Sequence, residues 1–336
     1  MGWLKKLIGK IGSAQPTDWT LLDNLPDPGL GIAGKPIVPD QCYIELYVES
    51  LRLEKARRFA TTFHGLIYSF ASLSRQGTDR AELASVTKPQ NLATLGVNDL
   101  SRVITVSKRI MASMPWRGSP LGLELGLFSI KSGNLLSPLV NYITKVSDLA
   151  GISVVTRLNP FVPLVLEGMD MIAGQTADSE LELAIDTDMD LSDTRLCALI
   201  AKPKDTIPAG SLKIDPQDRK LLVNGKPLEA AYCVFSIRSS SMNPAWGEIP
   251  ALKDAYADFT RAIVSGKHKE AEEALAAFNR QLIVSPDLIS ADKDRLKEKV
   301  RADLREAFPG GGQSAPEGVR ARFENRQLAD LNLYDQ

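Results

Sequence analysis

The chain has 336 residues, of which 44% are apolar, with 40 Lys and Arg side chains against 41 Asp and Glu. This length and apolar content suffice for a substantial core and exclude a largely disordered chain. The near-zero net charge argues against a general nucleic-acid-binding protein, whose affinity depends on many basic side chains that neutralise phosphates. No apolar run is long enough to predict a membrane-spanning helix.

Residues 1–12 predict an amphipathic N-terminal helix whose charges are all basic. So short a helix is unstable alone in water and needs an apolar surface. A bilayer interface would supply one, with Trp at headgroup level and the lysines near phosphates, and the pattern resembles that of short cationic membrane-active peptides. The alternative is that the helix docks on its own domain or on a protein partner. The residues expected to contact an anionic membrane surface are Trp3, Leu4, Lys5, Lys6, Leu7, Ile8, Lys10 and Ile11.

Residues 13–40 are rich in proline and glycine and predict an extended connector. Within it, residues 29–36 nearly match the phosphate-binding pattern G-x-x-x-x-G-K-[S/T]. Pro36 occupies the last position, where it supplies neither a hydroxyl group for Mg²⁺ nor an N–H group for phosphate. No strand is predicted before this loop and no helix after it, so we reject nucleotide binding here.

Residues 41–241 predict a β-rich domain because short segments of alternating apolar residues recur between turn-forming clusters. Residues 41–53 predict a long strand, and residues 211–228 predict a hairpin with a tight turn at Asn224-Gly225. Helical spacing of apolar residues predicts two inserted helices over 135–149 and 159–173.

The three cysteines are Cys42, Cys197 and Cys233, which are widely spaced and lie mostly in apolar, strand-like sequence. They predict reduced core thiols in a cytosolic protein. The first residues also lack the apolar core and cleavage site of a secretory signal. We therefore expect a cytoplasmic protein, peripheral on the inner face of a membrane if the N-terminal helix meets lipid.

A candidate metal site consists of Asp186, Asp188 and Asp190, which follow a predicted strand. Carboxylate oxygens suit hard divalent cations, but the EF-hand pattern fails because its sixth position is not Gly and its twelfth is Cys197. An acidic turn between two strands explains the same residues without a ligand. A divalent cation is thus the one cofactor that the sequence suggests.

Residues 249–308 predict a helical appendage packed against the side of the sheet, and residues 309–336 predict a flexible linker followed by a tail peptide. A tethered amphipathic tail suits contact with a neighbouring protomer or a partner groove, although it could equally be a disordered terminus. The tail residues expected to bind a partner are Phe323, Leu328, Leu331 and Tyr334.

The sequence therefore predicts an α+β chain with an antiparallel, sandwich-like β-rich body, two inserted helices and a C-terminal helical appendage. No complete catalytic motif occurs in it. The first hypothesis is a non-catalytic binding protein, a membrane-associated scaffold or effector subunit that uses both termini for contact. The alternatives are a cation-dependent hydrolase or transferase that uses the three aspartates, and an oligomeric structural subunit.

Overall fold

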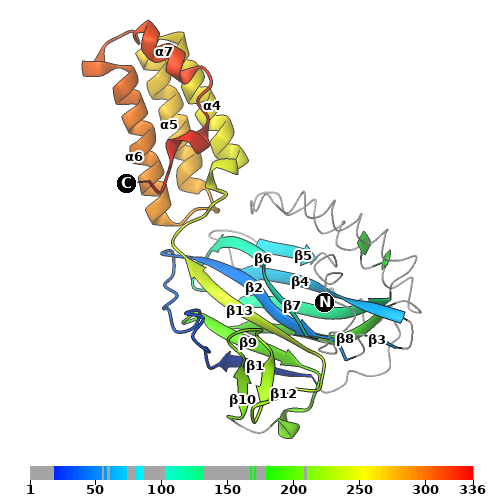
Figure 1. The fold of residues 1–336 in the computed structure, drawn as a ribbon. Coiled ribbons are helices and arrows are strands. Elements are labelled where there is room, and N and C mark those ends of the chain that lie inside the picture. The colour runs from blue at the N-terminus through cyan, green and yellow to red at the C-terminus, as the bar shows by residue number, and fades with distance from the viewer. Residues whose placement is uncertain are drawn as a thin grey trace.

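The chain is an α+β protein, with antiparallel sheets in its N-terminal and central parts and helices mostly in its C-terminal part (Figure 1). This confirms the predicted fold class. A computed structural model describes residues 19–54, 57–58, 61–73, 81–86, 103–131, 167–168, 170–171, 179–207 and 210–335. The predicted helices 1–12 and 135–149 lie outside the described residues. Of the predicted helix 159–173, residues 167–168 and 170–171 are described, and they are helical.

The first sheet has the strand order β1-β9-β13-β2-β6, and its neighbouring strands are antiparallel. Its members in the described residues are β1 (Thr20–Leu25), β2 (Tyr43–Arg52), β6 (Val103–Pro115), β9 (Arg195–Ile200) and β13 (Tyr232–Ser240). The strand predicted over 41–53 is confirmed as β2.

The second sheet has the order β3-β4-β7-β8, and β5 also pairs with β4. Its described strands are β3 (Arg57–Arg58), β4 (Thr61–Leu73), β5 (Ala81–Val86), β7 (Leu121–Lys131) and β8 (Ser179–Met189). A small third sheet is formed by β10 (Leu212–Ile214), β11 (Leu221–Val223) and β12 (Lys226–Pro227), which confirms the hairpin predicted over 211–228.

Side chains alternate along each strand, so the part of the first sheet formed by β1, β9 and β13 contributes to one core on each of its two faces. One face packs against the second sheet, where Ile44 and Leu46 share a core with Leu125. The other face packs against the third sheet, where Ala198 shares a second core with Leu212. This arrangement explains why β9 is apolar at nearly every position, as central strands buried on both faces are.

The three cysteines are buried and free, as predicted. Cys197 and Cys233 lie in the core between the first two sheets, and burial raises the pKa of both thiols. Their thiolate forms are therefore scarce at neutral pH, which makes both side chains chemically inert.

Strand β1 is a departure from the predicted connector. It pairs with β9, with Thr20 opposite Ile200, and so extends the first sheet into residues that were expected to form a loop. Its apolar residues gain their burial from a strand that lies far away in sequence. The body therefore begins well before residue 41.

The loop after β1 wraps around the carboxylate of Asp27. Its two oxygens accept hydrogen bonds from the backbone N–H groups of Gly29 (3.0 Å), Leu30 (2.6 Å), Ile32 (2.6 Å) and Ala33 (2.9 Å). Burial alone would raise the pKa of Asp27, but these four donors outweigh it and lower that pKa below its ordinary value. A strand does precede this loop, yet its amides hold a carboxylate of the same chain.

The C-terminal helices form a separate unit beyond the end of β13, with a core of its own (Figure 1). Its elements are η4 (Trp246–Glu248), α4 (Pro250–Ser265), α5 (His268–Val284), α6 (Ser290–Ala307), η5 (Pro309–Gly311), α7 (Glu317–Phe323) and η6 (Leu328–Leu331). This confirms the predicted helices but not their packing against the side of the sheet. The apolar faces of the helices are covered by the tail after α6 and not by the sheet.

We predict that Asp27→Asn lowers the free energy of unfolding at pH 7 by about 1 kcal/mol, since the amide leaves some backbone N–H groups without an acceptor. Because the folded pKa of Asp27 is lowered, its ionised form stabilises the fold above the unfolded pKa. That contribution is lost as the pH falls through the folded pKa. Urea denaturation at pH 7 and at acidic pH checks this, with Asp205→Asn, an exposed aspartate, as the matched control. Equal destabilisation by both substitutions would contradict the prediction.

Candidate functional site

Two of the three candidate metal residues lie in a strand, and Asp190 follows its end. Asp186 and Asp188 belong to β8, which continues to Met189 because Met189 pairs with Leu121 of β7. Both carboxylates and that of Asp190 are exposed. In the part of the chain that the structure describes, no group of three or more His, Cys, Asp or Glu side chains is placed to hold a metal ion.

The candidate membrane-binding residues, Trp3 to Ile11, lie outside the described residues. Among the helices that the structure does describe, none has both the length and the apolar character needed to cross a bilayer.

The tail residues are packed against their own chain. Phe323, Leu328 and Leu331 are buried in the core of the helical unit, and Tyr334 packs against it. The segment predicted to be a flexible linker is bonded to the connection between α4 and α5. Lys267 and Ser314 form a β-bridge, and Ala315 donates a backbone hydrogen bond to Gly266. The apolar spacing of the tail was recognised correctly, but it gave no indication of which surface the tail would cover.

The junction between the body and the helical unit is built around Asp292, whose side chain is fully buried in the first turn of α6. Its Oδ2 accepts hydrogen bonds from the hydroxyl of Tyr43 on β2 (2.5 Å) and from that of Tyr334 in the tail (2.7 Å). Its Oδ1 pairs with Arg295 at 2.7 Å. One carboxylate thus joins the sheet, the helices and the C-terminal tail.

Backbone groups complete this network. The N–H of Ile289 donates to the Tyr43 hydroxyl (3.2 Å), and the N–H of Asn243 donates to the Tyr334 hydroxyl (2.7 Å). Burial, followed by the hydrogen bond to Asp292, raises the pKa of Tyr43 well above its ordinary range. Tyr43 therefore stays neutral and remains a donor at all physiological pH values.

A second contact across the junction is formed by Arg117, which follows β6. Its guanidinium pairs with Asp40 and donates to the backbone oxygen of Leu288 at 2.9 Å, just before α6. Asp40 in turn accepts a hydrogen bond from the hydroxyl of Ser290 at the start of α6. The two contacts fix the first turn of α6 to the body from different strands.

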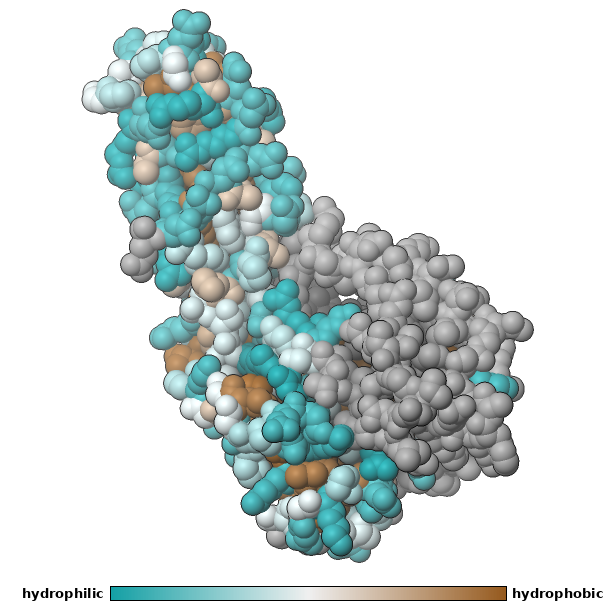
Figure 2. Space-filling model, in the orientation of Figure 1, coloured by the Kyte–Doolittle hydropathy of each residue, from teal (hydrophilic) through white to brown (hydrophobic). Residues whose placement is uncertain are grey.

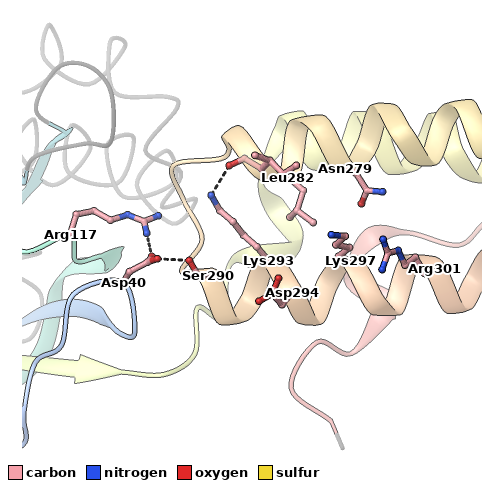
Figure 3. A pocket seen from close by; sticks show the side chains of 10 residues that line it. Asp40, Arg117, Asn279, Leu282, Ser290, Lys293, Asp294, Lys297 and Arg301 are labelled. Carbon is pink, nitrogen blue, oxygen red and sulfur yellow. Dashed lines mark hydrogen bonds and ion pairs between the residues drawn. The ribbon is translucent and has the colours of Figure 1, made fainter.

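Beside this second contact lies a pocket of about 540 Å³ between the body, α5 and α6 (Figure 3). Its charged lining residues are Arg117, Lys293, Lys297, Arg301, Asp40 and Asp294. Four of these are basic and two are acidic, so the lining carries an excess of positive charge. Lys297 and Arg301 project from α6 toward Asn279 of α5 (Figure 3).

The pKa values of two basic residues in the pocket are lowered. Burial and then the positive charge of Arg117 lower the pKa of Lys293. The ammonium group of Lys293 donates to the backbone oxygen of Ile283 at the end of α5 (2.9 Å). Burial also lowers the pKa of Arg117. An anion in this space would meet side chains whose charges are only partly balanced.

The rim of the pocket includes the C-terminal end of α5, where Ile283 is 69% exposed, and Val284 beside it is 71% exposed. On the face of the helical unit that Figure 2 shows, most of the surface is hydrophilic. Two adjacent exposed aliphatic residues are therefore unusual for this unit.

Sequence reasoning missed the junction, and only one signal could have indicated the pocket. Lys293, Lys297 and Arg301 recur every four residues within the segment 249–308, which was predicted to be helical. This spacing places all three on one face. The tyrosines and Asp292 carry no such signal because their partners are remote in sequence.

Comparisons with protein-family models, with curated proteins and with solved structures found no match.

We predict that Tyr43→Phe lowers the free energy of unfolding by about 1–3 kcal/mol, because it removes one donor to a buried carboxylate and leaves the Ile289 N–H without its acceptor. Chemical denaturation of the full chain measures the effect. Tyr47→Phe is the matched control, since that hydroxyl forms only a 3.3 Å hydrogen bond in a half-buried position. A smaller loss for Tyr43→Phe than for its control would disprove the role of the junction.

We also predict that Phe323→Ala destabilises the helical unit by about 3–5 kcal/mol, the range for removing a fully buried aromatic side chain. Phe323 is 1% exposed, whereas Ile283 is 69% exposed, so Ile283→Ala should change the stability by less than about 0.5 kcal/mol. Thermal unfolding followed by far-ultraviolet circular dichroism compares the two. Native stability in Phe323→Ala would mean that the tail is not part of the fold in solution.

Proposed function

We propose that this protein is a non-catalytic binding protein that associates with an anionic membrane surface at the cytoplasmic face. The observation that carries the proposal is the composition of residues 1–12, which combine Trp3, an aliphatic stripe and three lysines with no acidic residue. An apolar face and exclusively basic charge are the two features that interfacial helices use together.

The energetics favour lipid over solvent for this segment. Each lysine near an anionic leaflet contributes about 1 kcal/mol, and burial of Trp3 and the aliphatic side chains adds a hydrophobic term. A helix of this length gains little from its own hydrogen bonds in water, so folding and membrane binding would occur together.

The folded part of the chain binds its own tail. The junction at Asp292 holds the sheets, the helices and the tail as one platform, and the tail residues that were candidates for partner contact are engaged within the chain. Contact of the tail with a protein partner would require its release from α6. The membrane proposal therefore rests on the N-terminal segment alone.

The test is co-sedimentation of the full chain with vesicles of phosphatidylcholine, with and without phosphatidylserine. We expect binding that requires phosphatidylserine and falls at least about tenfold in a chain that starts at residue 17, and that weakens as salt is added. Equal binding of the two chains would end the proposal.

Two substituted chains separate the contributions of charge and apolar contact. Replacing Lys5, Lys6 and Lys10 by Gln should abolish the preference for phosphatidylserine, because it removes the electrostatic attraction. Trp3→Ala should weaken binding to both vesicle types. As a matched control, Lys253→Gln on α4 removes an exposed basic charge elsewhere and should leave binding unchanged.

A further inference from the structure

The pocket at the junction is large enough for a small molecule and is lined by hydrogen-bond donors. Its volume of about 540 Å³ lies within the range of small-molecule sites. Ser290, Lys293, Lys297 and Arg301 line it from successive turns of α6, and Arg117 lines it from the body. The space therefore exceeds what one inorganic ion fills.

The basic face of α6 is unfavourable for the helix itself. Like charges spaced four residues apart repel one another, and Lys293, Lys297 and Arg301 form two such pairs. Among the described residues Arg301 pairs with Glu298 at 2.9 Å, whereas Lys297 forms no ion pair. An anion between these side chains would turn repulsion into attraction.

Polar groups other than the cations also face this space. Asn279 lines the pocket, and its side-chain oxygen is buried without a hydrogen-bond partner in the described structure. A buried amide oxygen of this kind is satisfied by a hydroxyl donor. Leu282, which is buried, contributes an apolar wall.

We propose that the junction pocket binds a phosphate monoester of a polyol, with Lys297 and Arg301 holding the phosphate and Asn279 accepting a hydrogen bond from a hydroxyl group of the polyol. Ammonium and guanidinium groups form charge-assisted hydrogen bonds with phosphate oxygens, which are stronger than neutral ones. Lys293 donates to a backbone oxygen and adds positive charge to the lining, whereas Arg117 is already paired with Asp40.

The same chemistry can come from a soluble polyol phosphate or from a phospholipid headgroup. Glycerol phosphate represents the first source, and phosphatidylinositol 4-phosphate in phosphatidylcholine vesicles, whose headgroup carries both a phosphate monoester and free hydroxyl groups, represents the second. This site is separate from the N-terminal segment, so its occupancy does not depend on the membrane proposal.

Isothermal titration of the full chain with glycerol phosphate tests the pocket without any membrane. We expect saturable binding that Lys297→Ala with Arg301→Ala weakens about tenfold or more. The matched control is Lys253→Ala with Arg261→Ala, which removes one Lys and one Arg from the exposed face of α4. The control should bind as the unsubstituted chain does.

Two further measurements sharpen the test. Asn279→Ala should reduce the preference for glycerol phosphate over inorganic phosphate, because only glycerol phosphate carries alcohol hydroxyl groups at a distance from the phosphorus. Sedimentation with vesicles that contain phosphatidylinositol 4-phosphate, using the same two double variants, reports whether the lipid source also reaches the pocket. Circular dichroism confirms that each variant is folded.

Equal loss of affinity in the pocket variant and in its control would overturn the proposal, as would the absence of saturable binding both to glycerol phosphate and to vesicles that contain phosphatidylinositol 4-phosphate. Failure of the chain that starts at residue 17 to bind phosphatidylserine vesicles bears on the membrane proposal only. The two proposals can therefore fail separately.

Discussion

A buried carboxylate at the start of α6 sets the relation between the two halves of this protein. A lone charge as deeply buried as Asp292 would be strongly unfavourable. It is tolerated because two tyrosine hydroxyls donate to it, Arg295 pairs with it, and the N-terminal end of a helix favours negative charge. Each of these partners comes from a different part of the fold. Satisfying one acid thus requires the sheet, the helices and the tail to be in place together.

The position of the tail also depends on buried aspartates of α6. Asp303 lies eleven residues, or about three turns, beyond Asp292 on α6, and it repeats the arrangement with Tyr256 as donor (2.7 Å) and Arg326 of the tail as ion-pair partner (2.8 Å). The tail is therefore attached to α6 at both of its buried aspartates. Between them, Leu328 and Leu331 cover the apolar core of the helices. The segment that was expected to reach a partner instead completes its own unit.

Local signals predicted the elements that depend on local chemistry. Alternation in residues 41–53 indicated β2, and Asn224-Gly225 indicated the hairpin. Gly266 ends α4 in the left-handed conformation that glycine adopts without strain, which is also a local effect. Features that depend on remote partners were missed. Strand β1 forms because it pairs with β9, which lies far away in the sequence. Tyr43 and Asp292, which form a hydrogen bond, are separated by 249 residues. Of the candidate site, only the four-residue spacing of the basic residues on α6 could be read from sequence, because helix periodicity is local whereas the pocket walls are not.

Within the described residues, two places are suited to an anion, and they differ in where the anion comes from. At the loop after β1, glycines with positive φ turn the backbone N–H groups inward, and Asp27 supplies the negative charge that those groups require. That site is complete within the chain, so its resemblance to a phosphate-binding loop reflects shared backbone geometry. At the junction, three basic side chains on one face of α6 and a buried amide oxygen of Asn279 face the same space. Two carboxylates, those of Asp40 and Asp294, also line that space, and they leave the positive charge only partly balanced. A conformation that keeps like charges together against their repulsion is best explained by a ligand that carries the missing charge.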